Sequence, residues 1–94
     1  MSTFFMFGKY SSDSLKEPTD NWTRRILEII RQYDGEVRSM YSVMGAYDLV
    51  LIANFHMITQ ALQASVSITK ELGIAFSTLP AIPVEEFDKL VGTV

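Results

Sequence analysis

Two short stretches of this sequence are apolar at consecutive positions rather than at alternate ones. They are Phe4-Phe5-Met6-Phe7 and Leu49-Val50-Leu51-Ile52-Ala53. Runs rich in aromatic and β-branched residues favour β-strands. Because successive strand residues point to opposite faces, each of these strands is apolar on both sides. A sheet built around them therefore needs an apolar neighbour on each face.

Apolar periodicity and turn residues predict seven elements in the chain. The expected strands cover residues 4–10, 37–44, 47–55 and 74–79, and the expected helices cover 22–33, 58–72 and 85–91. The first six follow the order βαββαβ, which is the ferredoxin-like arrangement, and a short C-terminal helix comes after them. The predicted fold class is α+β, with a four-stranded antiparallel sheet whose first and third strands are central. One domain accounts for residues 1–94.

Glycine and proline positions set several of the predicted boundaries. Gly35 suits the left-handed position that ends the first helix, and Gly73 ends the second helix in the same way. Gly45-Ala46 predicts a tight reversal between the second and third strands. Pro80 is expected to end the fourth strand, because proline cannot donate a hydrogen bond within a sheet.

The two longer helices can cover only one face of the sheet. On the third strand Tyr47, Leu49 and Leu51 are expected on one face, with Val50 and Ile52 on the other. If about four to six such side chains stayed exposed, each would forgo about 1.5 to 3 kcal/mol of burial, a sum close to the stability of a small domain. We therefore predict a homodimer with two sheets stacked face to face, a dimeric α/β barrel. A small ligand is expected in or beside its interior.

The charge balance argues against nucleic-acid binding. Eight Lys and Arg residues stand against eleven Asp and Glu residues, the net charge is −3, and the longest basic cluster is Arg24-Arg25. This lacks the positive patch that phosphate backbones require. The longest uninterrupted apolar run has five residues, far short of a membrane span. We expect no membrane association and a cytoplasmic location.

The residue types needed for common metal and cofactor chemistry are scarce. The chain has no cysteine and one histidine, which excludes thiolate zinc sites and multi-histidine metal sites within one chain. Its glycines stand too far apart in the sequence to form a phosphate-binding loop. We therefore expect no metal and no cofactor.

Asp48 is a candidate for acid or base chemistry. It begins the third strand beside Val50 and Ile52, so under a second sheet laid over this strand it could act as a general base or a ligand anchor. The competing interpretation is structural. Asp48 would then accept backbone N–H groups in the Gly45 turn or pair with Arg38 on the neighbouring strand.

His56 is the second candidate of this kind. As the single histidine it could act alone as an acid or base near neutral pH. It stands at a strand-to-helix junction, where a capping or surface role is commoner. Either Asn54 or His56 is expected to open the second helix.

Three tyrosines and one arginine are candidate ligand contacts. Tyr10, Tyr41 and Tyr47 are expected on or near adjacent strands, where their hydroxyl groups could bind a small polar ligand in an apolar cleft. They could equally be core aromatics with their oxygens at the sheet rim. Arg38 could bind a carboxylate or another anion, or remain solvated on an edge strand.

Five segments follow one another along nearly the whole chain in a recognisable order. They are Phe7-Gly8-Lys9-Tyr10-Ser11, Ser39-Met40-Tyr41, Gly45-Ala46-Tyr47-Asp48-Leu49-Val50-Leu51-Ile52, Ala75-Phe76-Ser77-Thr78 and Pro83-Val84-Glu85-Glu86-Phe87. Together they resemble the GYD domain family of bacterial and archaeal proteins. The resemblance implies a ferredoxin-like domain related to the dimeric α/β barrels, which include cofactor-free monooxygenases, isomerases and the ligand-sensing domains of amino-acid-responsive regulators. It assigns no catalytic residue.

Three functions remain open from the sequence. The first is a homodimer that binds a small organic molecule without catalysis. The second is a cofactor-free oxygenase or isomerase, with Asp48 or His56 as base and Tyr41 or Tyr47 as hydroxyl partner, which requires these groups to converge on one cavity. The third is a module whose role is self-association alone.

Overall fold

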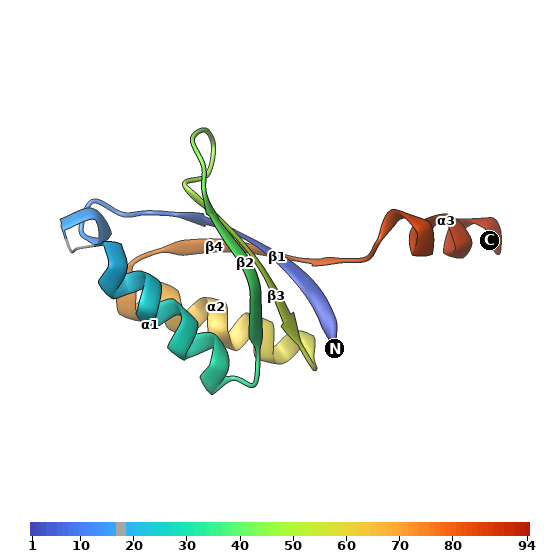
Figure 1. The fold of residues 1–94 in the computed structure, drawn as a ribbon, viewed down its shortest axis with the longest axis horizontal. Coiled ribbons are helices and arrows are strands. Elements are labelled where there is room, and N and C mark those ends of the chain that lie inside the picture. The colour runs from blue at the N-terminus through green and yellow to red at the C-terminus, as the bar shows by residue number, and fades with distance from the viewer. Residues whose placement is uncertain (17–18) are drawn as a thin grey trace.

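The computed structural model describes residues 1–16 and 19–94, and it consists of a sheet with two helices packed on one side (Figure 1). Its strands are β1 (Ser2–Lys9), β2 (Glu36–Ser42), β3 (Leu49–Phe55) and β4 (Ala75–Ala81). Its helices are α1 (Thr19–Gln32), α2 (Ile58–Leu72) and α3 (Val84–Gly92), with a short 3₁₀ turn, η1, at Ser14–Lys16. This order confirms the predicted ferredoxin-like βαββαβ arrangement.

The strands form one antiparallel sheet in the order β2-β3-β1-β4, which confirms the predicted central and edge positions. Phe5 on β1 stands opposite Ile52 on β3 and Leu79 on β4. Tyr41 on β2 stands opposite Val50 on β3. Because directly paired strand residues share a face, this register decides which side chains meet on each side of the sheet.

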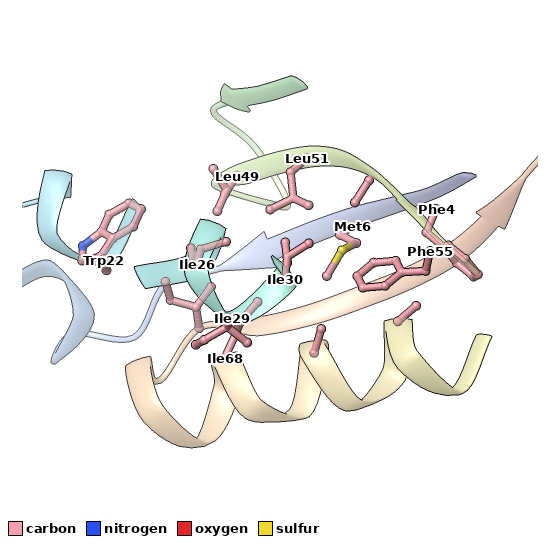
Figure 2. Packing of buried hydrophobic residues seen from close by; sticks show 14 residues of the cluster. Phe4, Met6, Trp22, Ile26, Ile29, Ile30, Leu49, Leu51, Phe55 and Ile68 are labelled. Carbon is pink, nitrogen blue, oxygen red and sulfur yellow. The ribbon is translucent and has the colours of Figure 1, made fainter. Parts of the chain in front are cut away.

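The core lies between the sheet and helices α1 and α2 (Figures 1 and 2). Phe4 packs edge to face against Phe55, with ring centroids 5.9 Å apart. The buried apolar residues are Phe4, Met6, Trp22, Ile26, Ile29, Ile30, Leu49, Leu51, Ala53, Phe55, Ala61, Ala64, Ile68 and Ile74. They are spaced four, three and one residues apart on α1 and three and four apart on α2, so each helix presents one apolar stripe to the sheet.

The opposite side of the sheet carries no helix among the described elements (Figure 1). Along β1, Phe5 and Phe7 are half-buried and alternate with fully buried residues. Along β3, Val50 and Ile52 do the same. The prediction that both sides of the central strands are apolar is confirmed.

The left-handed residue that ends α1 is Asp34, with φ of 61°, rather than the predicted Gly35. The Gly35 N–H donates to the Ile30 carbonyl at 2.8 Å, and the Asp34 N–H donates to the Arg31 carbonyl at 3.0 Å. These two bonds make a Schellman motif. Glycine is needed at position 35 for space, since a Cβ there would lie 2.7 Å from Phe55 Cδ1.

Residues 43–48 connect β2 to β3 in a protruding loop, which replaces the predicted tight reversal at Gly45-Ala46 (Figure 1). The Val43 N–H donates to the Asp48 carbonyl at 2.9 Å and closes the loop. Gly45 has φ of 149°, a conformation that favours glycine. Since β3 begins at Leu49, the alternation of strand side chains does not extend back to Tyr47.

Helix α2 covers the predicted residues 58–72, but a different residue caps its start. Met57 occupies the N-cap position that was expected for Asn54 or His56, and its N–H donates to the Gln60 side-chain oxygen at 3.1 Å. The end of the helix is as predicted, because Gly73 is left-handed with φ of 71° and its N–H donates back into the last turn.

Strand β4 continues through Pro80 to Ala81, although the sequence predicted an end at residue 79. The missing N–H of Pro80 is tolerated because β4 is an edge strand with no neighbour on its outer side. Ile82 and Pro83 then lead into α3, which stands apart from the sheet and from the other two helices (Figure 1).

Candidate functional site

The uncovered side of the sheet, which we call the open face, is the surface most suited to binding. The strand register places these side chains on it: Thr3, Phe5, Phe7, Tyr41, Val50, Ile52, Ser77 and Leu79. Tyr41 is 58% exposed and Leu79 is 51% exposed, while the side chains on β1 and β3 are half-buried. Contiguous large apolar side chains left in this state are typical of an interaction site.

Aromatic rings follow one another along the open face. The Phe5 and Phe7 centroids lie 6.5 Å apart, and the Phe7 and Tyr47 centroids lie 5.3 Å apart. The Tyr47 hydroxyl lies 3.4 Å from Ser77 Oγ on β4. The structure thus places Tyr47 over the open face, and the prediction that it shares a face with Leu49 is wrong because Tyr47 precedes the strand.

Asp48 ties the loop before β3 to the end of β1. Its Oδ2 accepts the Tyr10 backbone N–H at 3.0 Å, and its own N–H donates to the Gly8 carbonyl at 2.9 Å. The structural interpretation of Asp48 as an acceptor of backbone N–H groups therefore matches the geometry. The donor is the backbone N–H of Tyr10. It is neither a group of the Gly45 turn nor the Arg38 side chain.

Tyr10 lies on the helix side of the sheet, away from Tyr41 and Tyr47. Its ring packs against Trp22 at 4.8 Å between centroids. Burial raises the pKa of the Tyr10 phenol, a hydrogen bond with Ser42 lowers it in part, and the nearby Asp48 carboxylate raises it further. Tyr10 therefore serves the junction between β1 and α1 rather than the open face.

Arg38 and His56 lie away from the aromatic row. Arg38 is exposed at the bulge of edge strand β2, between Val37 and Ser39. His56 is exposed just after β3, whereas Asp48 just precedes that strand. Eight residues at about 3.3 Å each put these two some 26 Å apart. Within one protomer, the two candidate bases therefore lie at opposite ends of β3 and cannot serve one site together.

Four hollows in the described part of the chain lie away from these candidates. One of about 580 Å³ lies between Tyr33 and the exposed side of α2, and one of about 480 Å³ lies between Trp22, the 3₁₀ turn and the end of α2. Others of about 410 and 350 Å³ lie between α2 and β4 and along α3. None of these four is lined by a sequence-predicted candidate.

Several residues of the open face were not among the predicted contacts. Phe5 and Phe7 were recognised as apolar on the second side, but their pairing with Ser77 and Leu79 depends on strand register. The register between strands that are distant in the sequence cannot be predicted from one sequence. The alternation along β1 was nevertheless sufficient to predict Phe5 and Phe7 as residues of the open face.

Two further features can be stated for the part of the chain that the structure describes. No three His, Asp or Glu side chains there come together in a group that could hold a metal ion. No helix in residues 1–16 or 19–94 has the length and apolar character needed to cross a bilayer.

The elements and the sheet order define a ferredoxin-like βαββαβ domain with one apolar sheet face left open. The chain belongs to the GYD domain family, whose sequence model matches residues 4–91. A search of curated protein sequences gives no match.

Solved structures support the fold. The leucine response regulatory protein LrpA from Mycobacterium tuberculosis is similar with a TM-score of 0.61 and 15% identity, over 87% of this chain and 51% of that one. The protein TTHA0845 from Thermus thermophilus is similar with a TM-score of 0.58 and 24% identity, over 88% of this chain and 95% of that one. The chain thus spans about half the length of the Mycobacterium protein. At these identities the likeness concerns the fold alone.

Proposed function

We propose that the protein is a homodimer that stacks its two open faces and binds a small organic molecule between them. The observation that carries the proposal is the row of half-exposed apolar side chains from Phe5 to Tyr47, bordered by tyrosine hydroxyl groups. A second copy offers the same surface, so a two-fold contact covers both open faces without any other gene product.

Burial of apolar surface supplies the driving force for the proposed dimer. Tyr41 and Leu79 are each more than half exposed, and Phe7 and Val50 are half-buried. Removing such side chains from water stabilises an assembly by about 25 cal/mol per Å² of apolar surface. In a two-fold contact both copies bury these residues, so the buried apolar area is twice that of one copy.

The residues around the aromatic row indicate the chemistry of the ligand. Phe7 and Val50 offer apolar walls, and the hydroxyl groups of Tyr41 and Tyr47 offer polar contacts at the border. This combination suits a small aromatic or branched aliphatic molecule that carries one carbonyl or carboxylate group. The leucine response in the name of LrpA belongs to that protein, and it makes leucine a sensible first probe here.

A charge placed at the centre of the open face tests the dimer. We expect Val50→Lys to yield a monomer in light scattering, because a buried unpaired ammonium is strongly unfavourable. Gln32→Lys, at the exposed end of α1, is the matched control and should leave the dimer intact. A dimer that survives Val50→Lys would contradict the proposed interface.

Thermal shift with leucine, phenylalanine and benzoate tests the ligand. At least one probe is expected to raise Tm in the wild type, and the increase should shrink when Tyr41 and Tyr47 are changed together to Phe. Tyr33→Phe, beside the hollow on α2, is the control. If Tyr33→Phe alone removes the increase, the ligand lies on the helix side and the proposed site is wrong. If no probe raises Tm, binding of this ligand class is rejected, leaving self-association alone.

A further inference from the structure

The C-terminal arm, residues 82–94, projects from the rest of the protein. Every residue in it is exposed, and α3 has no buried residue. Figure 1 shows α3 separated from the sheet by the connector after β4. The radius of gyration is 14.2 Å, against roughly 12 Å expected for a compact chain of this length. The arm therefore makes the protomer longer than its core requires.

One side of α3 is apolar although no described residue of the protomer buries it. The stripe consists of Val84, Phe87, Leu90 and Val91, spaced three, three and one residues apart. Phe87 is 55% exposed and Leu90 is 59% exposed. Such a stripe is the pattern of a helix that packs against another surface.

Helix α3 is too short to be stable in water by itself. It has nine residues, whereas isolated helices shorter than about 12 to 15 residues are marginal even with favourable sequences. Glu85 and Glu86 in the first turn complement the helix dipole, but this contributes only about 0.3 to 1 kcal/mol for each charge. A folded α3 therefore needs an apolar surface against its stripe.

The arm's own protomer is badly placed to supply that surface. Only Ile82 and Pro83 join β4 to α3, and two residues span at most about 7 Å. Pro83 is extended, with φ of −58° and ψ of 147°. In the structure this connector places α3 beyond the end of β4 and away from its own open face (Figure 1).

We infer that the arm docks on a second copy of this chain, with the stripe of α3 against the rim of the partner's sheet. The arm continues the strand that carries Leu79, which is 51% exposed on the open face, so the apolar surface of the arm is continuous with the proposed interface. In a two-fold dimer each copy supplies one arm and receives one, and both stripes are covered. This inference rests on the homodimer proposed above.

Hydrogen exchange of the α3 amides over a dilution series tests the docking. Amides of residues 87–92 are expected to be protected at concentrations where the wild type is dimeric, and to exchange at unfolded rates in the Val50→Lys monomer. Protection that persists in the monomer would place the arm on its own protomer and overturn the inference. A dimer whose α3 amides exchange freely would overturn the arm contact while leaving the face-to-face dimer standing. Absence of any dimer would reject both.

Substitutions in the stripe give an independent measurement. Phe87→Ser together with Leu90→Ser is expected to raise the dimer Kd by about tenfold or more, since each dimer loses both pairs of side chains. Circular dichroism checks that the core stays folded, as it should because α3 buries nothing in it. Glu85→Gln, on the opposite side of α3, is the control. Equal Kd values for the double variant and the control would contradict the docking.

Discussion

The ring of Phe7 on the central strand β1 lies 5.3 Å from the ring of Tyr47, which stands in the loop before β3. This contact lays part of the protruding loop over the open face. The loop is closed on its other side by Asp48, whose carboxylate accepts the Tyr10 N–H. Tyr47 and Asp48 therefore form one end of the apolar surface and attach the loop to the sheet.

Removing the Tyr47 ring should cost more than removing its hydroxyl. Tyr47→Ala loses the contact with Phe7, and we expect the free energy of unfolding to fall by about 1 kcal/mol. Tyr47→Phe keeps the ring and loses only a 3.4 Å contact with Ser77, so a change below about 0.5 kcal/mol is expected. Urea unfolding of both variants decides this, and equal losses would mean that the ring contact is unimportant.

Asp48→Ala should loosen the junction between the loop and β1. The variant leaves the Tyr10 N–H without its acceptor, which is expected to cost about 1 to 2 kcal/mol of unfolding free energy. Asp48→Asn keeps an oxygen acceptor and should lose less. Amide exchange at Tyr10 gives a local readout, and an unchanged exchange rate in Asp48→Ala would rule out the tether.

Two glycines should respond to alanine with opposite signs. Gly35→Ala places a Cβ within 2.8 Å of Ile30 Cγ2 and within 2.7 Å of Phe55 Cδ1, and we expect a loss of about 1 to 3 kcal/mol. Gly92→Ala meets nothing within 4 Å and lies in α3, where alanine favours the helix by about 1 kcal/mol. Chemical denaturation measures the first variant, and helical content of the arm measures the second. A neutral Gly35→Ala would contradict the packing beneath α1.

The ion pair between α1 and α2 should make a small contribution that depends on pH. Arg25 Nη2 donates to Glu71 Oε1 at 2.8 Å, and Arg25 Nε also donates to this carboxylate. The hydrogen bond from Arg25 lowers the pKa of Glu71 below its ordinary value of 4.5. A lowered folded-state pKa stabilises the fold above the unfolded value, and this stabilisation is lost as pH falls through the folded pKa.

Glu71→Gln is therefore expected to lower Tm slightly near neutral pH and to match the wild type in acid well below pH 4.5. Both groups are exposed, which keeps the effect small. Differential scanning calorimetry at several pH values measures it, with Asp88→Asn, exposed on α3, as a control away from α1 and α2. A Tm difference that grows as pH falls would reverse the assigned sign.

Much of the fold follows from local patterns in the sequence. The three- and four-residue spacing of Ile26, Ile29 and Ile30 predicts α1, and the uninterrupted apolar run of β3 predicts a central strand with two apolar sides. These features depend on neighbours in the chain. They are therefore readable without knowing what lies across the core.

The parts that could not be predicted depend on contacts between distant segments. Gly35 is needed because Phe55 lies against it, and Tyr47 turns to the open face because β3 starts two residues later than its β-favouring composition suggests. The amphipathic pattern of α3 was visible, but a stripe does not say which surface it packs against. The open face could not be predicted in full for a similar reason, since the register between distant strands decides which of its side chains are neighbours.

If one copy of the chain is incomplete, the wild-type protein is a dimer, and sedimentation equilibrium measures this. We expect a mass of twice 10.6 kDa at micromolar concentrations and above. A mass that stays at 10.6 kDa throughout the concentration range would contradict it, because the open face and the arm would then both remain in water.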